Sequence, residues 1–265
     1  MFKGAELIAD DMKQHTDNDL KRFSLLCCDI FLREACLIIS RAPYSTDVKF
    51  IPKGLHVNPK KMRNSLQEEI DNSDDEGYDA ILLGFGLCGN VAEGLKARKT
   101  PLVIPRVHDC IAIFYGSNSR YIEEFSTNPG TYHYTSGSFE RKRLNDSNHG
   151  ALGVDLDPDH EKRFEEYKAK YGEENAEYLI AVEKGWSKNY TRVVYFDLPE
   201  MKFLNYEERT KGIAERKGLE FVIKDADMSI LQRLLSGEWN DDFLIVRPGQ
   251  SIISTHDARV IDAIN

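Results

Sequence analysis

The sequence lacks any apolar run close to the ~20 residues needed to cross a bilayer. Its N-terminal stretch, MFKGAELIADDMKQHTDNDLKRF, lacks the apolar core of a signal peptide. Basic residues are outnumbered by acidic ones, 35 to 44, and the net charge of −9 provides no basic excess for broad nucleic-acid binding. We therefore expect a cytoplasmic protein with neither nucleic acid nor membrane as a partner.

Cysteines are also few, with five among 265 residues. Two are adjacent, one falls in a helical pattern, and two stand near glycine or histidine. This spacing does not resemble the disulfide framework of a secreted domain. In a reducing compartment it favours metal binding or thiol chemistry. The hydrophobic fraction of 41% and charged fraction of 30% are typical of a soluble globular protein.

Short apolar runs alternate with helix-like segments from Arg22 onward. Buried parallel strands have this appearance, and the alternation predicts βαβ units with right-handed crossovers. The expected fold is α/β, with a doubly wound, mainly parallel sheet whose first and third strands lie side by side, the second and fourth outside them. The predicted strands are 23–28, 48–51, 80–83 and 102–104, and the predicted helices are 30–39, 59–71 capped by Asn58, and 90–98.

The C-terminal half repeats the alternation with different lengths. It predicts two helices at 157–171 and 175–184, strands at 192–196, 220–223 and 243–246, and helices at 206–217 and 228–235. This second βαβ half forms either a small second domain or further strands of the same sheet. The predicted divisions are an N-terminal arm or helix at 1–21, an α/β half at 22–134, a loop or crossing at 135–160, and a second α/β half at 161–265.

Cysteine or histidine stands at three of the predicted strand ends, at Cys28, Cys88, His108 and Cys110. The carboxyl ends of parallel strands meet at one edge of the sheet, so these side chains can face one crevice. Thiolate and imidazole are zinc ligands, and sites of three cysteines and one histidine are common. An iron–sulfur cluster is the alternative occupant. The simpler reading is that the cysteines are small buried hydrophobes.

The residues beside these candidates suggest supporting roles. Adjacent strand residues point to opposite faces, so only one of Cys27 and Cys28 is expected to be a ligand, and Cys28 is nearer the strand end. Cys36, inside an apolar helix, is assigned to the core. Residues that could orient a ligand or contact a substrate are Asp29, Gly86, Gly89, Asp109 and Arg106.

A glycine pattern surrounds Cys88. Gly84, Gly86 and Gly89 match the dinucleotide fingerprint literally, but the match follows the third strand, and no acidic residue stands where a ribose contact needs one. Tight turn geometry is the better explanation. The predicted helix at 90–98 would also place Cys88 at a helix N-terminus, where the dipole lowers a thiol pKa, and a cysteine enzyme is therefore a further hypothesis.

With these residues in view, the chain resembles the uncharacterised family called domain of unknown function 1638. The similar segments are LLCCDIFLREA, YDAILLGFGLCGN, PRVHDCIAIFYGS, NPGTYHYTSG, KNYTRVVYF and IVRPGQSI, spread over most of the chain. Three features are characteristic of the family: a cysteine before an acidic residue, a glycine-flanked cysteine and a His-x-Cys step. Here they fall on Cys28 with Asp29, on Cys88 with Gly86 and Gly89, and on His108 with Cys110.

Members of that family are frequently encoded beside corrinoid-dependent methyltransferases of methanogens and anaerobic bacteria, so the resemblance implies one-carbon metabolism. The first hypothesis is a metal-binding protein, with zinc as the metal, that activates a small-molecule thiol for methyl transfer. The alternative is a non-catalytic accessory module that binds a cofactor, an iron–sulfur cluster, or a corrinoid protein or methyltransferase partner. Whether the protein is an enzyme is left open by the sequence.

Overall fold

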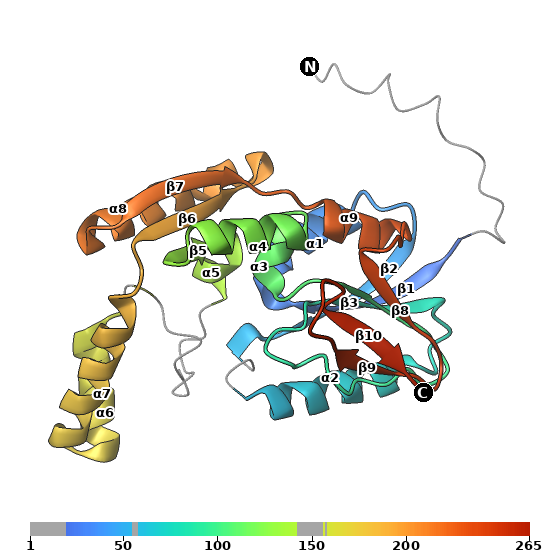
Figure 1. The fold of residues 1–265 in the computed structure, drawn as a ribbon, viewed down its shortest axis with the longest axis horizontal. Helices are drawn as coiled ribbons and strands as arrows, with labels where there is room; N and C mark the ends of the chain where they lie inside the picture. The colour runs from blue at the N-terminus through green and yellow to red at the C-terminus, as the bar shows by residue number, and fades with distance from the viewer. Residues whose placement is uncertain (1–19, 55–57, 142–155, 157) are drawn as a thin grey trace.

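The computed structural model describes residues 20–54, 58–141, 156 and 158–265 (Figure 1). Of the predicted N-terminal arm, residues 1–19 lie outside this description, as does most of the loop predicted at 135–160. No helix among the described residues has both the length and the apolar character needed to cross a membrane.

A five-stranded sheet forms the centre of the protein. Its order is β2-β1-β3-β4-β8, with the first four strands parallel and β8 antiparallel to β4. The predicted α/β class and mainly parallel sheet are confirmed, including β1 and β3 side by side with β2 and β4 outside them. The strands are β1 (Arg22–Cys28), β2 (Ser45–Ile51), β3 (Ala80–Gly84), β4 (Leu102–Pro105) and β8 (Phe243–Val246).

The inner strands are buried on both faces, which explains their continuous apolar sequences. Every residue of β3 and β4 is buried. Gly84 ends β3 opposite Cys27, and a Cβ atom there would lie 2.6 Å from the Cys27 sulfur. Glycine at this position therefore lets the end of β1 pack directly against β3.

Helices cover this sheet, and their first residues follow the expected capping chemistry. Asn58 accepts a hydrogen bond from Lys61 N at the start of α2, and Ser117 caps α4 in the same way. The Cys36 prediction is wrong, because this residue lies on the exposed side of its helix. The helices are α1 (Leu32–Ile39) after the short 3₁₀ turn η1 (Asp29–Phe31), α2 (Pro59–Ser73), α3 (Cys110–Phe114), α4 (Asn118–Thr127) and α9 (Ser229–Ser236).

The helix predicted at 90–98 is absent. Cys88, Gly89 and Asn90 have φ angles of 48°, 63° and 68°, a left-handed turn that cannot begin a right-handed helix. The chain then runs beside residues 249–252, and Gly94 N donates to Ile252 O at 2.7 Å. Cys88 is therefore not at a helix N-terminus, and the dipole argument for a reactive Cys88 thiol fails.

A second sheet has three parallel strands in the order β5-β6-β7. Its strand β5 was not predicted from the sequence, and the short helix α5 falls in the stretch predicted as a loop. The C-terminal hairpin of β9 and β10 was also not predicted. The elements are β5 (Thr131–Tyr134), α5 (Ser136–Glu140), β6 (Arg192–Asp197), η3 (Pro199–Leu204), α8 (Tyr206–Lys217), β7 (Glu220–Asp225), β9 (Ser251–Ser254) and β10 (Ile261–Ile264).

Helices α6 (His160–Tyr171) and α7 (Glu173–Ser187) form a hairpin that stands apart from both sheets (Figure 1). The two helices pack mainly on each other. An ion pair joins them, from Arg163 Nη2 to Glu183 Oε1 at 2.7 Å, and the Tyr167 hydroxyl donates to the same oxygen at 2.6 Å.

A buried carboxyl lies where the two sheets' helices meet. Ser136 Oγ of α5 donates to Glu34 Oε1 of α1 at 2.7 Å, and the other Glu34 oxygen has no hydrogen-bond partner among the described residues. Nearby, a Cβ atom on Gly137 would lie 2.1 Å from Ile30 O, so glycine is required for α5 to approach η1. Burial raises the pKa of Glu34 to about 7.

This carboxyl should make the protein less stable as pH rises. The pKa of Glu34 is about 7 when folded and 4.5 as a free side chain, so the folded state holds the extra proton between these values. The free energy of unfolding should fall across that window by about 3 kcal/mol. Urea unfolding from pH 4 to 8 should show this slope reduced in Glu34→Gln. The control Ser136→Ala keeps the Glu34 carboxyl and should retain the dependence of unfolding free energy on pH. If Glu34→Gln leaves that dependence unchanged, Glu34 is not its cause.

Candidate functional site

Three of the four predicted metal ligands come together at the carboxyl edge of the central sheet. Cys28 ends β1, Cys88 lies in the turn after β3, and Cys110 begins α3 after β4. Their exposed fractions are 1%, 7% and 7%. The sulfurs of Cys88 and Cys110 are 3.6 Å apart, and the Cys110 thiol interacts with both other thiols. We call these three residues the thiol cluster.

Two backbone hydrogen bonds hold the loops of the thiol cluster together. Leu87 N donates to Val107 O at 2.9 Å, and Cys88 N donates to His108 O at 2.8 Å. Gly86 makes this approach possible, because a Cβ atom there would lie 2.8 Å from the N and Cα atoms of Asp109. Close packing thus accounts for Gly84 and Gly86, and the left-handed φ angle of 63° accounts for Gly89.

Asp109 fixes the start of the helix that carries Cys110. Its Oδ1 atom accepts from Ile111 N at 2.9 Å and from Ala112 N at 3.2 Å, which makes it the N-cap of α3. Its Oδ2 atom accepts from the Tyr121 hydroxyl at 2.7 Å. Burial, with the nearby Asp109 charge, raises the pKa of Tyr121. Both carboxylate oxygens therefore have partners that hold Cys110 in place.

His108 takes part in this site through its backbone. Its N–H donates to Asn118 Oδ1 at 3.1 Å, and its carbonyl accepts from Cys88. Its imidazole is exposed, unlike the three thiols. Ligation of a metal by His108 stays a prediction.

The other predicted supporting residues lie in different networks. Asp29 is 2% exposed and accepts from Lys53 N at 2.8 Å and Arg141 Nε at 3.1 Å. Arg106 donates to the Ile261 carbonyl in the C-terminal hairpin. Gly89 adopts a left-handed φ angle of 63° next to Cys88.

Cys27 and Cys28 differ in their surroundings, as their alternation along β1 requires. The Cys27 sulfur donates to Gly84 O at 3.8 Å inside the core, and burial raises the pKa of its thiol. Cys28, by contrast, lies beside Cys110.

The thiol cluster consists of closely packed, buried thiols. Hydrogen bonding to Cys28 and then to Cys88, together with burial, raises the pKa of Cys110. Zinc–sulfur bonds of about 2.3 Å in a tetrahedron place two sulfurs about 3.8 Å apart, close to the separation of Cys88 and Cys110. Across the described residues, no set of three or more His, Cys, Asp or Glu side chains is already arranged as a complete metal site.

Two polar aromatic contacts near the site were not anticipated. The Tyr115 hydroxyl lies 3.0 Å from His133 Nε2, and the His133 ring stacks on Phe196. Burial lowers the pKa of His133 to about 4, so its imidazole is neutral at physiological pH. The sequence around His133 gives little signal for this contact, because the short strand β5 carries little apolar pattern.

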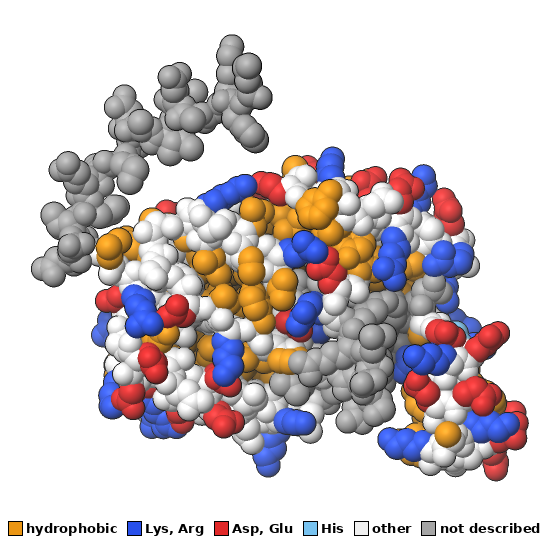
Figure 2. All heavy atoms as spheres, turned by 180° about the vertical axis from the view of Figure 1, so that it is seen from behind, with side chains coloured by type: hydrophobic (Ala, Val, Ile, Leu, Met, Phe, Trp, Pro, Cys, Tyr) orange, Lys and Arg blue, Asp and Glu red, His pale blue; other side chains and the backbone are white. Residues whose placement is uncertain are grey.

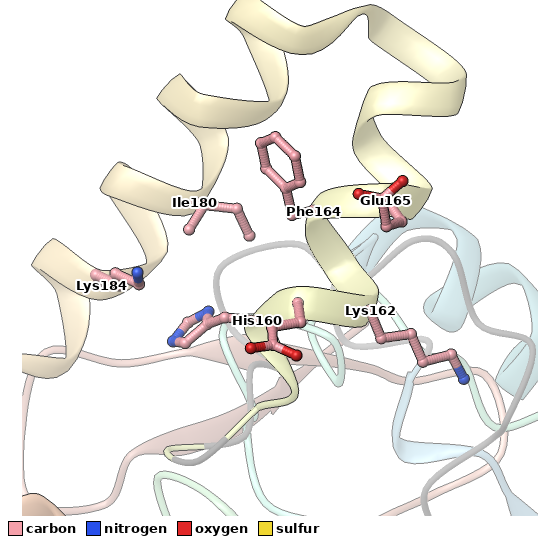
Figure 3. Close-up of a pocket in the computed structure, with 7 residues that line it drawn as sticks. His160, Lys162, Phe164, Glu165, Ile180 and Lys184 are labelled. Carbon is pink, nitrogen blue, oxygen red and sulfur yellow. The ribbon is translucent and has the colours of Figure 1, made fainter.

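A cavity of about 580 Å³ lies elsewhere, in the α6–α7 hairpin (Figure 3). Its lining includes His160 and Phe164 of α6 with Ile180 and Lys184 of α7. None of the predicted site residues lines it.

Comparison with known proteins places the chain in a family. A family model described as a protein of unknown function, DUF1638, matches residues 50–235. The chain belongs to this family. The range matched by the DUF1638 model includes Cys88, His108 and Cys110, and Cys28 precedes it. No curated protein and no solved structure matches the chain.

The contact between the two loops can be tested at Gly86. Gly86→Ala should lower the free energy of unfolding by about 3 kcal/mol, because the added methyl group meets backbone atoms that cannot move aside easily. Gly89→Ala has open space and should cost only about 1 kcal/mol, from its left-handed φ angle. Urea unfolding measures both changes. Equal costs for the two variants would count against the role assigned to Gly86.

Proposed function

We propose that Cys28, Cys88 and Cys110 bind one thiophilic metal ion, zinc in the first instance, and that the fourth position accepts a small-molecule thiol for methyl transfer. The convergence of three buried thiols from three separate strand ends supports the metal site. Sites with three protein ligands and an open position are typical of catalytic zinc. In this proposal the fourth position goes to an external ligand, because the imidazole of His108 is exposed.

The residues of this chain would act by positioning and by excluding water. The loop contacts at Val107 and His108 hold Cys88 against Cys110, and the Asp109 cap fixes the first turn of α3. A bound zinc ion would lower the pKa of an incoming thiol and hold it as a nucleophilic thiolate. Its S–CH3 bond would form as the bond between the methyl group and its donor, a corrinoid in the context that the family resemblance implies, breaks with the electron pair left on the donor. The methyl-group context comes from the family resemblance, and it supports this substrate class over other zinc chemistry.

The second candidate is an accessory module that binds an iron–sulfur cluster or a corrinoid methyltransferase partner without catalysis. The same thiols support it, because cysteine thiolates are the usual ligands of iron–sulfur clusters. Zinc is colourless and iron–sulfur clusters absorb visible light, so a spectrum separates the two occupants.

Metal content should depend on the thiol cluster and on no other cysteine. Protein purified without oxygen and without a metal-binding tag should contain about one zinc per chain. Cys28→Ser, Cys88→Ser and Cys110→Ser should each lose most of it, while Cys36→Ser, at an exposed position on α1, should keep it. Elemental analysis with an absorption spectrum measures this. Equal metal in all four variants would refute the site.

His108→Ala tests whether histidine belongs to the ligand set. If the three thiols suffice, the variant should keep wild-type zinc content and affinity, because its imidazole is exposed at the surface. A loss of zinc as large as that of Cys110→Ser would show instead a closed site of four protein ligands.

Zinc affinity should weaken in acid. The pKa of Cys110 is raised by its thiol neighbours and by burial, so its thiol is protonated at neutral pH and must lose that proton to bind metal. For each thiol that must lose its proton to bind zinc, the affinity falls about tenfold for every unit that the pH drops below the pKa of that thiol. Competition with a chelator between pH 6 and 8 should show at least this slope. A flat profile would contradict ligation by Cys110.

A further inference from the structure

The α6–α7 hairpin presents an apolar surface that no other described part of the chain covers. On α7, Tyr178, Ala181, Val182 and Gly185 recur at the spacing that places residues on one helix face. Tyr178 is 68% exposed and Val182 is 52% exposed. A Cβ atom on Gly185 would have no neighbour within 4 Å. We call these four residues the α7 stripe.

Gly185 is informative because glycine weakens a helix interior by about 0.5–1 kcal/mol relative to alanine. In the α7 stripe it stands one turn from Ala181, and together they leave a shallow strip beside the larger Tyr178 and Val182 side chains. Small residues on a helix face let a second backbone approach closely. The stripe therefore has the shape that a partner helix would fit.

The charges bordering the α7 stripe identify the partner. Glu174 and Glu177 precede Ala181, while Lys184 and Lys188 follow it, and all four are exposed. At 100° per residue Glu177, Lys184 and Lys188 fall along one border of the stripe, and Glu174 lies one turn before Tyr178 at the N-terminal end of the stripe, next to that border. Residues on equivalent borders meet when two helices pack antiparallel. A second α7 related by a two-fold axis at Ala181 would bring Glu174 opposite Lys188, and Glu177 within one residue of Lys184.

We propose that two copies of this chain associate through the α7 stripe, with their α7 helices antiparallel about a two-fold axis at Ala181. The pattern is self-complementary, as an isologous contact requires. The antiparallel arrangement also opposes the two helix dipoles. Each hairpin would contribute two helices to a four-helix arrangement outside both sheets, where Figure 1 shows the hairpin and Figure 2 shows its mixed acidic and basic surface.

The first test is the mass of the full-length protein in solution. Sedimentation equilibrium should find a dimer whose dissociation constant rises at least tenfold in Val182→Glu, because the substitution buries a charge in the stripe. Helicity by circular dichroism and zinc content should stay at wild-type values, so that failure here is separate from failure of the metal site. A monomer at the highest soluble concentration, or a dimer unaffected by Val182→Glu, would overturn the proposal.

Charge exchange tests the antiparallel geometry. Glu174→Lys and Lys188→Glu should each weaken the dimer about tenfold, because each replaces two attractive pairs with two repulsive ones. An equimolar mixture of the two variants should recover wild-type affinity, since the mixed dimer restores opposite charges at both pairs. Glu166→Lys on α6, away from the stripe, is the control and should leave the affinity unchanged. If the mixture does not recover the wild-type dissociation constant, this antiparallel geometry is excluded. If the protein associates only with a different protein and not with itself, the proposed self-association is wrong.

Discussion

The site depends on the short contact between the loops that follow β3 and β4. Two backbone hydrogen bonds, from Leu87 and Cys88 to the carbonyls of Val107 and His108, fix the separation of these loops. Gly86 permits the contact because no side chain stands between the backbones. The parallel sheet brings the strand ends to one edge, but only this contact brings Cys88 within 3.6 Å of Cys110. The thiol cluster therefore depends both on the parallel order of the strands and on glycine at position 86.

Burial gives this cluster its chemical character. Thiols packed against one another in a dry environment keep their protons, as the raised pKa of Cys110 indicates. A metal ion reverses that preference, because thiolates are its ligands and their charge is then compensated. The same physical argument distinguishes Cys27, which burial also keeps neutral but which faces the core beside Gly84. Cys27 and Cys28 are adjacent in sequence, but their side chains point to opposite faces of β1, and only that of Cys28 joins the thiol cluster.

Much of the fold was predictable because its signals are local. The apolar runs of β1, β3 and β4, the Asn58 cap and the span of α8 all follow from pattern and capping chemistry. The convergence of cysteines was predictable from parallel topology. The left-handed turn at Cys88 was not, because non-glycine residues rarely adopt it and tertiary contacts to residues 249–252 stabilise the extended chain beyond it. The exposure of His108 depends on loop geometry that sequence spacing does not encode.

X-ray absorption at the zinc edge of the purified protein tests the central claim most directly. The account predicts a sulfur shell of three ligands at about 2.3 Å, with a fourth ligand that changes when a small-molecule thiol is added. Loss of most of the zinc, and with it the sulfur shell, in Cys110→Ser but not in Cys36→Ser would assign the shell to the thiol cluster. A metal bound only by nitrogen and oxygen, or a sulfur shell unchanged by that substitution, would contradict the account.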